Sequence, residues 1–191
     1  MGDLEAAFES FGLKRRFVDE SGYEVEPLTP LLARAEGAEL RPALRGSLDD
    51  RPAVIGLVRQ DGRGLIVVIT SVEGSTAVVP RLYCRPRDAG GATGALDRER
   101  AWAENAELAR RYGVATSPYQ DLGWVRRLFS ERFTEWLVSV PAPGYGFELA
   151  YGDLVGWVSA DGATEATLAG VWDWTEIVAA RIARESAGVA A

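Results

Sequence analysis

The chain has 191 residues, 47% of them apolar, a formal net charge of −7 and a predicted isoelectric point near 4.8. This length fits one domain, residues 1–191, with a core of its own. No apolar run reaches the roughly 18 residues of a membrane-spanning helix, and the acidic N-terminus is unlike a signal peptide, so we expect a soluble, cytoplasmic protein without membrane insertion. The acidic charge also argues against nucleic acid as a partner.

Histidine is absent, and the only cysteine and the only lysine are Cys84 and Lys14. The chain therefore cannot build a Ser-His-Asp relay, a histidine-containing zinc site or an intrachain disulfide. A lone lysine near the N-terminus also argues against a Schiff base or a P-loop. We expect no catalytic residue, no metal site and no cofactor. Cys84 lies in an expected strand, which favours a buried structural thiol over a nucleophile.

The N-terminal part of the chain predicts two short helices. Leu4, Phe8 and Phe11 recur at helical spacing, which predicts an amphipathic helix that ends at Gly12. Thr29 is placed to cap a second helix, and Pro30 takes its first position.

Four strands are expected next, joined by reversals at Asp61-Gly62 and Glu73-Gly-Ser75. Their arrangement is predicted to be an antiparallel meander. Residues 65–70 are apolar on both faces, so this stretch is expected to be the central strand. The predicted strands are 40–47, 53–60, 64–72 and 76–85.

The middle of the chain is less regular. Residues 88–96 are rich in glycine and have no hydrophobic pattern, so we expect a flexible loop there. Residues 98–111 contain good helix formers and predict a helix. A short strand is expected at 112–116.

A helix, a proline break and a hairpin are expected between Arg126 and Val158. Apolar residues at helical spacing predict one amphipathic helix that Pro141 and Pro143 end. Residues 145–151 alternate like a strand with one buried face, and Gly152-Asp153 predicts a type II′ turn into a strand at 154–159. The last helix is predicted at 164–186, and the tail at 187–191 is expected to fray.

These elements predict an α+β fold, with a mostly antiparallel sheet of about six strands and helices packed mainly on one face. The predicted core consists of Phe8, Val54, Leu57, Ile66, Val68, Phe133, Trp136, Leu137, Phe147, Leu149, Trp157, Val171 and Trp172.

Over most of its length the chain resembles a family of uncharacterised actinobacterial proteins, soluble or membrane-anchored. One matching feature is the central apolar strand. The other matching stretches are AAFESFGLKRRFV, LRGSLDDRPAVIGL, VVPRLYCRPR, ARRYGVATS and FTEWLVSVPAPGYGFELAYGDLVGWV. These motifs are structural, and the resemblance implies no activity, ligand or catalytic residue.

Carboxylates are the only acid–base groups left, and their nearest pairs fit solvated surface better than a catalytic or metal pair. These pairs are Asp49-Asp50, Asp173 with Glu176, and Glu104 with Glu107.

Three tryptophans, Trp102, Trp124 and Trp174, are poorly explained by the predicted apolar faces. The candidate interaction surface is Trp124, Arg126, Arg127, Arg132 and Trp174.

We therefore predict a non-enzymatic interaction or accessory module that binds another protein or a second copy of itself as a homodimer. The alternative is a small-molecule binder or a carboxylate-dependent hydrolase, which needs a deep pocket with convergent Asp, Glu, Tyr or Arg side chains.

Overall fold

The computed structural model describes residues 2–26, 29–33, 35, 37, 39–60, 62–72, 81–87, 100–102, 104–118, 120–140 and 144–187. The helices are α1 (Gly2–Arg15), α2 (Pro30–Ala33), α3 (Ala106–Arg111), α4 (Leu122–Leu128), α5 (Glu131–Ser139) and α6 (Glu165–Ala187). The strands are β1 (Val18–Asp19), β2 (Tyr23–Glu24), β3 (Glu39–Leu40), β4 (Ala43–Leu48), β5 (Arg51–Gln60), β6 (Arg63–Ser71), β7 (Leu82–Pro86), β8 (Arg100–Trp102), β9 (Tyr112–Thr116), β10 (Gly146–Ala150) and β11 (Asp153–Ser159).

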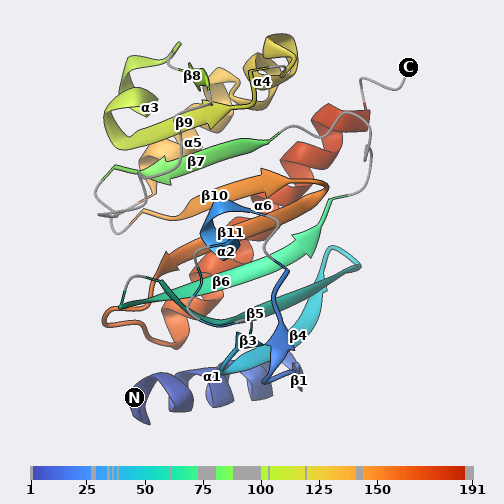
Figure 1. Cartoon of the computed structure of the whole chain (residues 1–191), viewed down its shortest axis with the longest axis vertical. Helices are drawn as coiled ribbons and strands as arrows, with labels where there is room; N and C mark the ends of the chain where they lie inside the picture. Colours follow the sequence, from blue (N-terminus) through green and yellow to red (C-terminus); the bar gives the residue numbers. More distant parts are fainter. Residues whose placement is uncertain are drawn as a thin grey trace.

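The α+β class is confirmed, and the large sheet is antiparallel throughout (Figure 1). Nine strands form it in the order β1-β4-β5-β6-β11-β10-β7-β9-β8, so the expected number of about six was too low. The strands β2 and β3 make a separate pair.

The predicted four-stranded meander is wrong at its last step. Strands β4, β5 and β6 follow one another as expected, but the C-terminal hairpin lies between β6 and β7. Strand β11 pairs with β6 from Asp153↔Ser71 to Ser159↔Leu65, and β10 pairs with β7. Turn residues predict a reversal without fixing which strand fills the neighbouring position. Because β6 and β11 are both apolar on two faces, they occupy the interior of the sheet.

The hairpin turn lies one residue earlier than predicted. Ala150 pairs with Asp153, so the two turn residues are Tyr151 and Gly152. Both have positive φ, +55° and +92°, which is the pattern of a type I′ turn and not of the expected type II′ turn.

Several helix boundaries also differ from the prediction. Helix α1 continues through Gly12 to Arg15, because this glycine packs closely against Leu44 of β4 and is no C-terminal cap. The single helix expected after Arg126 is two helices, α4 and α5, and Ser130 is the N-terminal cap residue of the second.

The helix predicted at 98–111 begins later than expected. Residues 100–102 form β8, which pairs with β9, and α3 starts only after Asn105. The Asn105 side chain accepts a hydrogen bond from the Leu108 amide, which is the capping signal that fixes this boundary.

Other local predictions are confirmed. The Thr29 hydroxyl caps α2 by accepting a hydrogen bond from the Leu32 amide at 3.3 Å, and Pro30 is the first helical residue. The strand at 112–116 and the last helix are present. None of the described helices is long and apolar enough to span a membrane.

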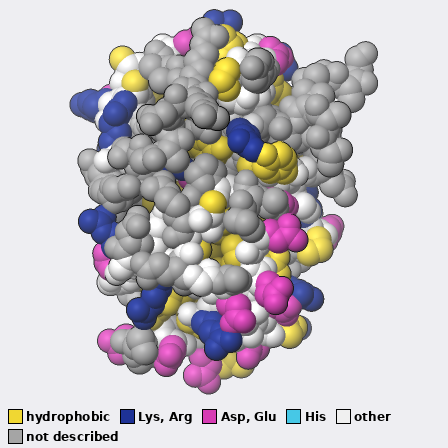
Figure 2. All heavy atoms as spheres, in the orientation of Figure 1, with side chains coloured by type: hydrophobic (Ala, Val, Ile, Leu, Met, Phe, Trp, Pro, Cys, Tyr) yellow, Lys and Arg dark blue, Asp and Glu magenta, His cyan; other side chains and the backbone are white. Residues whose placement is uncertain are grey.

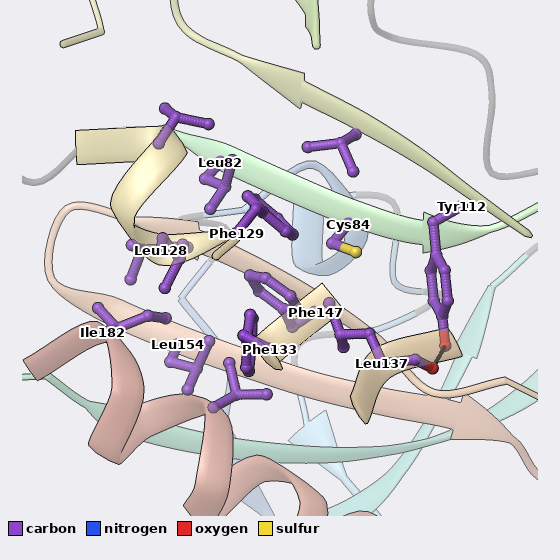
Figure 3. Packing of buried hydrophobic residues seen from close by; sticks show 14 of the residues in the cluster. Leu82, Cys84, Tyr112, Leu128, Phe129, Phe133, Leu137, Phe147, Leu154 and Ile182 are labelled. Atoms are coloured by element: carbon purple, nitrogen blue, oxygen red, sulfur yellow. Dashed lines mark hydrogen bonds between the residues drawn. The ribbon is translucent and has the colours of Figure 1, made fainter. Parts of the chain in front are cut away.

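The core has three clusters that use both faces of the large sheet. Residues of α3, α4, α5 and α6 pack with β7, β9, β10 and β11 in one cluster, and α1 packs with α6, β5 and β6 in a second. Figure 3 shows Phe129, Phe133 and Phe147 close together in the first of these. Helix α2 belongs to the third cluster, in front of β10 and β11 in Figure 1, while α6 passes behind them.

The predicted core is confirmed, except that Leu57 and Trp136 are half-buried. Strand β10 is wrongly predicted to have one exposed face, because all five of its residues are buried. The loop predicted at 88–96, the strand residues 76–80, the two prolines at 141 and 143 and the tail residues 188–191 lie outside the described residues.

Candidate functional site

The two tryptophans of the predicted interaction surface are not at the surface. Trp124 and Trp174 are only 4% and 3% exposed, so the expected exposed aromatic cluster is not formed. The sheet covers helix α6 on one side and neighbouring helices cover it on the other. More of the helix surface is therefore buried than the apolar stripe in the sequence predicts. Trp174 accordingly stacks on Trp136 with a centroid separation of 5.9 Å.

Trp102, which was also unexplained in sequence, is buried as well. Its ring stacks on Phe129 with 4.9 Å between the ring centroids. Burial in the first core cluster therefore accounts for all three tryptophans that the sequence left outside an apolar face.

The three arginines of the same surface are solvent-exposed. The side chains of Arg126 and Arg127 are 58% and 49% exposed, and Arg132 is exposed at the start of α5. Helix α4 holds the first two; Asp121 caps it by accepting a hydrogen bond from the Gly123 amide.

Arg126 grips one carboxylate in a fork. Its Nε lies 2.8 and 3.0 Å from the two carboxylate oxygens of Glu104, and its Nη2 lies 2.6 Å from Oε1. The hydrogen bond from Arg126 lowers the pKa of Glu104 below its ordinary value. Arg127 has a looser contact, with 3.6 Å between its Nε and Oε2 of Glu185.

Arg181 fixes this corner of the molecule from α6. Its guanidinium donates hydrogen bonds to the carbonyl oxygens of Arg127 and Leu128 and to the Ser130 hydroxyl. It also forms an ion pair with Glu185, with an N···O distance of 3.1 Å. These contacts bind the α4–α5 connection to α6 and set where the exposed arginines lie.

The carboxylate pairs considered in sequence mostly bind arginines instead of facing each other. Asp49 lies 3.6 Å from Arg51, Glu107 lies 2.6 Å from Arg110, and Asp173 lies 2.8 Å from Arg15, each measured between nitrogen and oxygen. Among the described residues, no group of three or more His, Cys, Asp or Glu side chains could hold a metal ion.

A buried ion pair between β7 and β10 was not predicted. Glu148 is 0% and Arg85 is 6% exposed. Oε1 of Glu148 accepts hydrogen bonds from Nε of Arg85 at 2.8 Å and from its Nη2. Oε2 accepts a hydrogen bond of 2.9 Å from the Leu31 amide at the start of α2. The guanidinium of Arg85 also lies 5.3 Å from the ring centroid of Tyr83.

Glu148 acts as an anchor in this arrangement, because protein donors occupy both of its oxygens. The alternation predicted at 145–151 placed Glu148 on the exposed face of its strand. The pairing of β7 with β10 would have revealed the contact, because Glu148 stands opposite Tyr83 and Arg85 lies two residues further along β7 on the same face. That pairing joins residues 63 positions apart and leaves no local signal.

Cys84 is fully buried, as expected for a structural thiol. Desolvation raises the pKa of its thiol well above the ordinary range, which disfavours the reactive thiolate.

Comparison with family models, curated proteins and solved structures finds no match to this chain. The resemblance to an actinobacterial family therefore stays a prediction.

Proposed function

We propose that this chain is a non-enzymatic protein-interaction module, and that Arg126, Arg127 and Arg132 bind an acidic segment of its partner. These three residues are called the arginine surface below. The main support is the contact between Arg126 and Glu104. Two nitrogens of this exposed guanidinium, Nε and Nη2, bind one carboxylate together, which is the geometry that an acidic partner residue would use.

The exposure of this fork favours exchange with a partner. Both side chains are about half exposed, and ion pairs in such surroundings contribute little to stability. An incoming carboxylate can therefore replace Glu104 at small cost. Arg132 makes no ion pair with another described residue, so it adds a positive charge that no acid of the described chain balances.

The distribution of charge along the chain also favours an acidic partner at the arginine surface. Among the described residues between 81 and 132, nine are arginines and four are Asp or Glu, although the protein as a whole is acidic. Residues 133–180 contain seven Asp or Glu residues and neither lysine nor arginine. Such an asymmetry steers an acidic partner toward the arginine-rich end and away from the remainder of the surface.

A labelled peptide tests the proposal. The probe is a twelve-residue peptide rich in Glu and Asp with a fluorescent label, and its binding is followed by anisotropy at low salt. We expect the triple variant Arg126→Gln, Arg127→Gln, Arg132→Gln to bind about tenfold or more weakly than the wild type. Added salt should weaken wild-type binding, because exposed charges are screened over about 10 Å at 0.1 M.

The matched control is Arg16→Gln, Arg41→Gln, Arg45→Gln, which removes the same charge from exposed arginines near the other end of the sheet. In Figure 2, acidic and basic side chains are mixed over this lower end of the molecule. We expect the control to change peptide binding less than twofold. Equal losses in the two triple variants, or no binding by the wild type, would contradict the proposal.

A homodimer would satisfy the same arginines with the acidic 133–180 region of a second copy. Sedimentation of the wild type and the arginine-surface variant tests this option, because only the wild type should then associate.

The alternative function is a small-molecule binder or carboxylate-dependent hydrolase. Among the described carboxylates, Glu148 is fully buried and is the candidate general base for it. A general base needs a free oxygen directed at the substrate. Both oxygens of Glu148 already accept hydrogen bonds from Arg85 and Leu31, which favours the anchoring role.

A further inference from the structure

The segment Thr29–Ala33, which contains α2, crosses the sheet face opposite α6 (Figure 1). Leu31 and Leu32 are 3% and 5% exposed and pack in the third cluster, which also contains Val155 and Trp157 of β11. The segment therefore covers the middle of the large sheet.

The hydrogen bonds within this segment are too few to keep it ordered without the sheet. The Leu32 amide donates to the Thr29 hydroxyl, and the Ala33 amide donates to the Thr29 carbonyl at 2.8 Å. A helix of four residues has no stability of its own, because its nucleation costs more than so few hydrogen bonds return. Its order depends on the buried leucines and on the bond from the Leu31 amide to Glu148.

We propose that Thr29–Ala33 is a strap that opens from the sheet as one unit, and that Glu148, held in place by Arg85, is its latch. Both latch residues belong to sheet strands, so opening breaks the bond to Leu31 and leaves the ion pair intact.

Opening would uncover two polar groups on an apolar face. The Oε2 atom of Glu148 would lose its donor. The indole of Trp157 packs in the same cluster as Leu31 and Leu32 and would lose their cover. Its nitrogen is buried and has no hydrogen-bond partner among the described residues, so it is the donor that this opening would offer to solvent or to a ligand. The closed strap therefore keeps a donor and an acceptor out of reach, as an autoinhibitory contact does.

Hydrogen exchange of the wild type tests whether the strap is a unit. The amides of Leu31, Leu32 and Ala33 are measured by NMR at increasing low concentrations of denaturant. We expect the three to share one opening equilibrium, at least tenfold more favourable than that of interior β11 amides, with little dependence on denaturant. Three unrelated rates, or exchange only through global unfolding, would overturn the proposal.

The variant Glu148→Gln tests the latch. Glutamine has one acceptor oxygen where Glu148 uses two. The Arg85 guanidinium takes that oxygen, and the NH2 group then faces the Leu31 amide, which loses its acceptor. We therefore expect all three strap amides to exchange about tenfold faster, together. Glu107→Gln, which removes a carboxylate at an exposed position, should leave them unchanged. Acceleration of Leu31 alone would show a lost hydrogen bond without strap opening and would overturn the latch. If Glu148→Gln does not fold, the wild-type measurement still decides whether the strap opens as a unit.

Discussion

The contact between β11 and α6 predicts a large effect of one added methyl group. A Cβ atom at Gly156 would lie 2.0 Å from Oγ1 of Thr175 and 3.0 Å from its Cβ and Cγ2 atoms. Thr175 is completely buried, and its hydroxyl donates a 2.7 Å hydrogen bond to the Val171 carbonyl. Moving this threonine would break its buried hydrogen bond, so we expect Gly156→Ala to push α6 away from the sheet.

The added methyl group should lower the stability of the protein, because it overpacks a core that is already filled. We expect Gly156→Ala to lower the free energy of unfolding by about 1–3 kcal/mol. Replacing Thr175 with alanine removes the closest atom but leaves the Cβ atom at 3.0 Å, so the double variant Gly156→Ala, Thr175→Ala should recover about 1 kcal/mol relative to the sum of the two single changes.

Urea unfolding followed by tryptophan fluorescence measures these free energies. Gly113→Ala in β9 is the matched control, because a Cβ atom there would meet only the Arg85 carbonyl oxygen at 3.9 Å. This control should be neutral or stabilising by up to about 1 kcal/mol, as expected for a strand glycine with room for a side chain. A Gly156→Ala protein within about 0.5 kcal/mol of the wild type, or strictly additive effects in the double variant, would refute the predicted contact.

Two further predictions concern titratable groups. The thiol of Cys84 is buried and its pKa is raised, so it should not react with a thiol reagent in the native state and should react fully in denaturant; native-state labelling at the denatured rate would contradict its position. Hydrogen bonds from Lys14 and Ser10 lower the folded-state pKa of Glu165, so its contribution to stability is present above the unfolded-state pKa and is lost as the pH falls through the lower folded-state value. The difference in Tm between the wild type and Glu165→Gln should therefore be largest near neutral pH and disappear in acid, whereas a difference independent of pH would contradict the assignment.

Local sequence signals were sufficient to predict several helices and strands. Thr29 and Pro30 predicted the start of α2, because a cap and a proline at the first position act within one turn. The apolar stretch 65–70 predicted an interior strand, because only such a strand has two buried faces.

Long-range pairing could not be predicted in the same way. The insertion of β10 and β11 between β6 and β7 depends on strands that are far apart in the chain, and turn residues near Gly74 carry no information about it. The same pairing buries Glu148 against Arg85, so the strap contact was missed together with the topology.

The sequence predicted the exposure of some of the candidate surface residues and not of others. Arg126, Arg127 and Arg132 lie at the surface because they fall outside the apolar faces of α4 and α5. Trp124 and Trp174 are buried because several elements pack around each helix, and a single apolar stripe does not describe such an environment.

The side-chain Nε–H resonances of the arginines report most directly on where an acidic partner binds. Spectra are recorded while the Glu- and Asp-rich peptide is added to the wild-type protein. The proposed function predicts that the resonances of Arg126, Arg127 and Arg132 shift with one binding curve, while those of Arg16, Arg41 and Arg45 stay in place. Shifts confined to the second group, or uniform shifts in both groups, would contradict it.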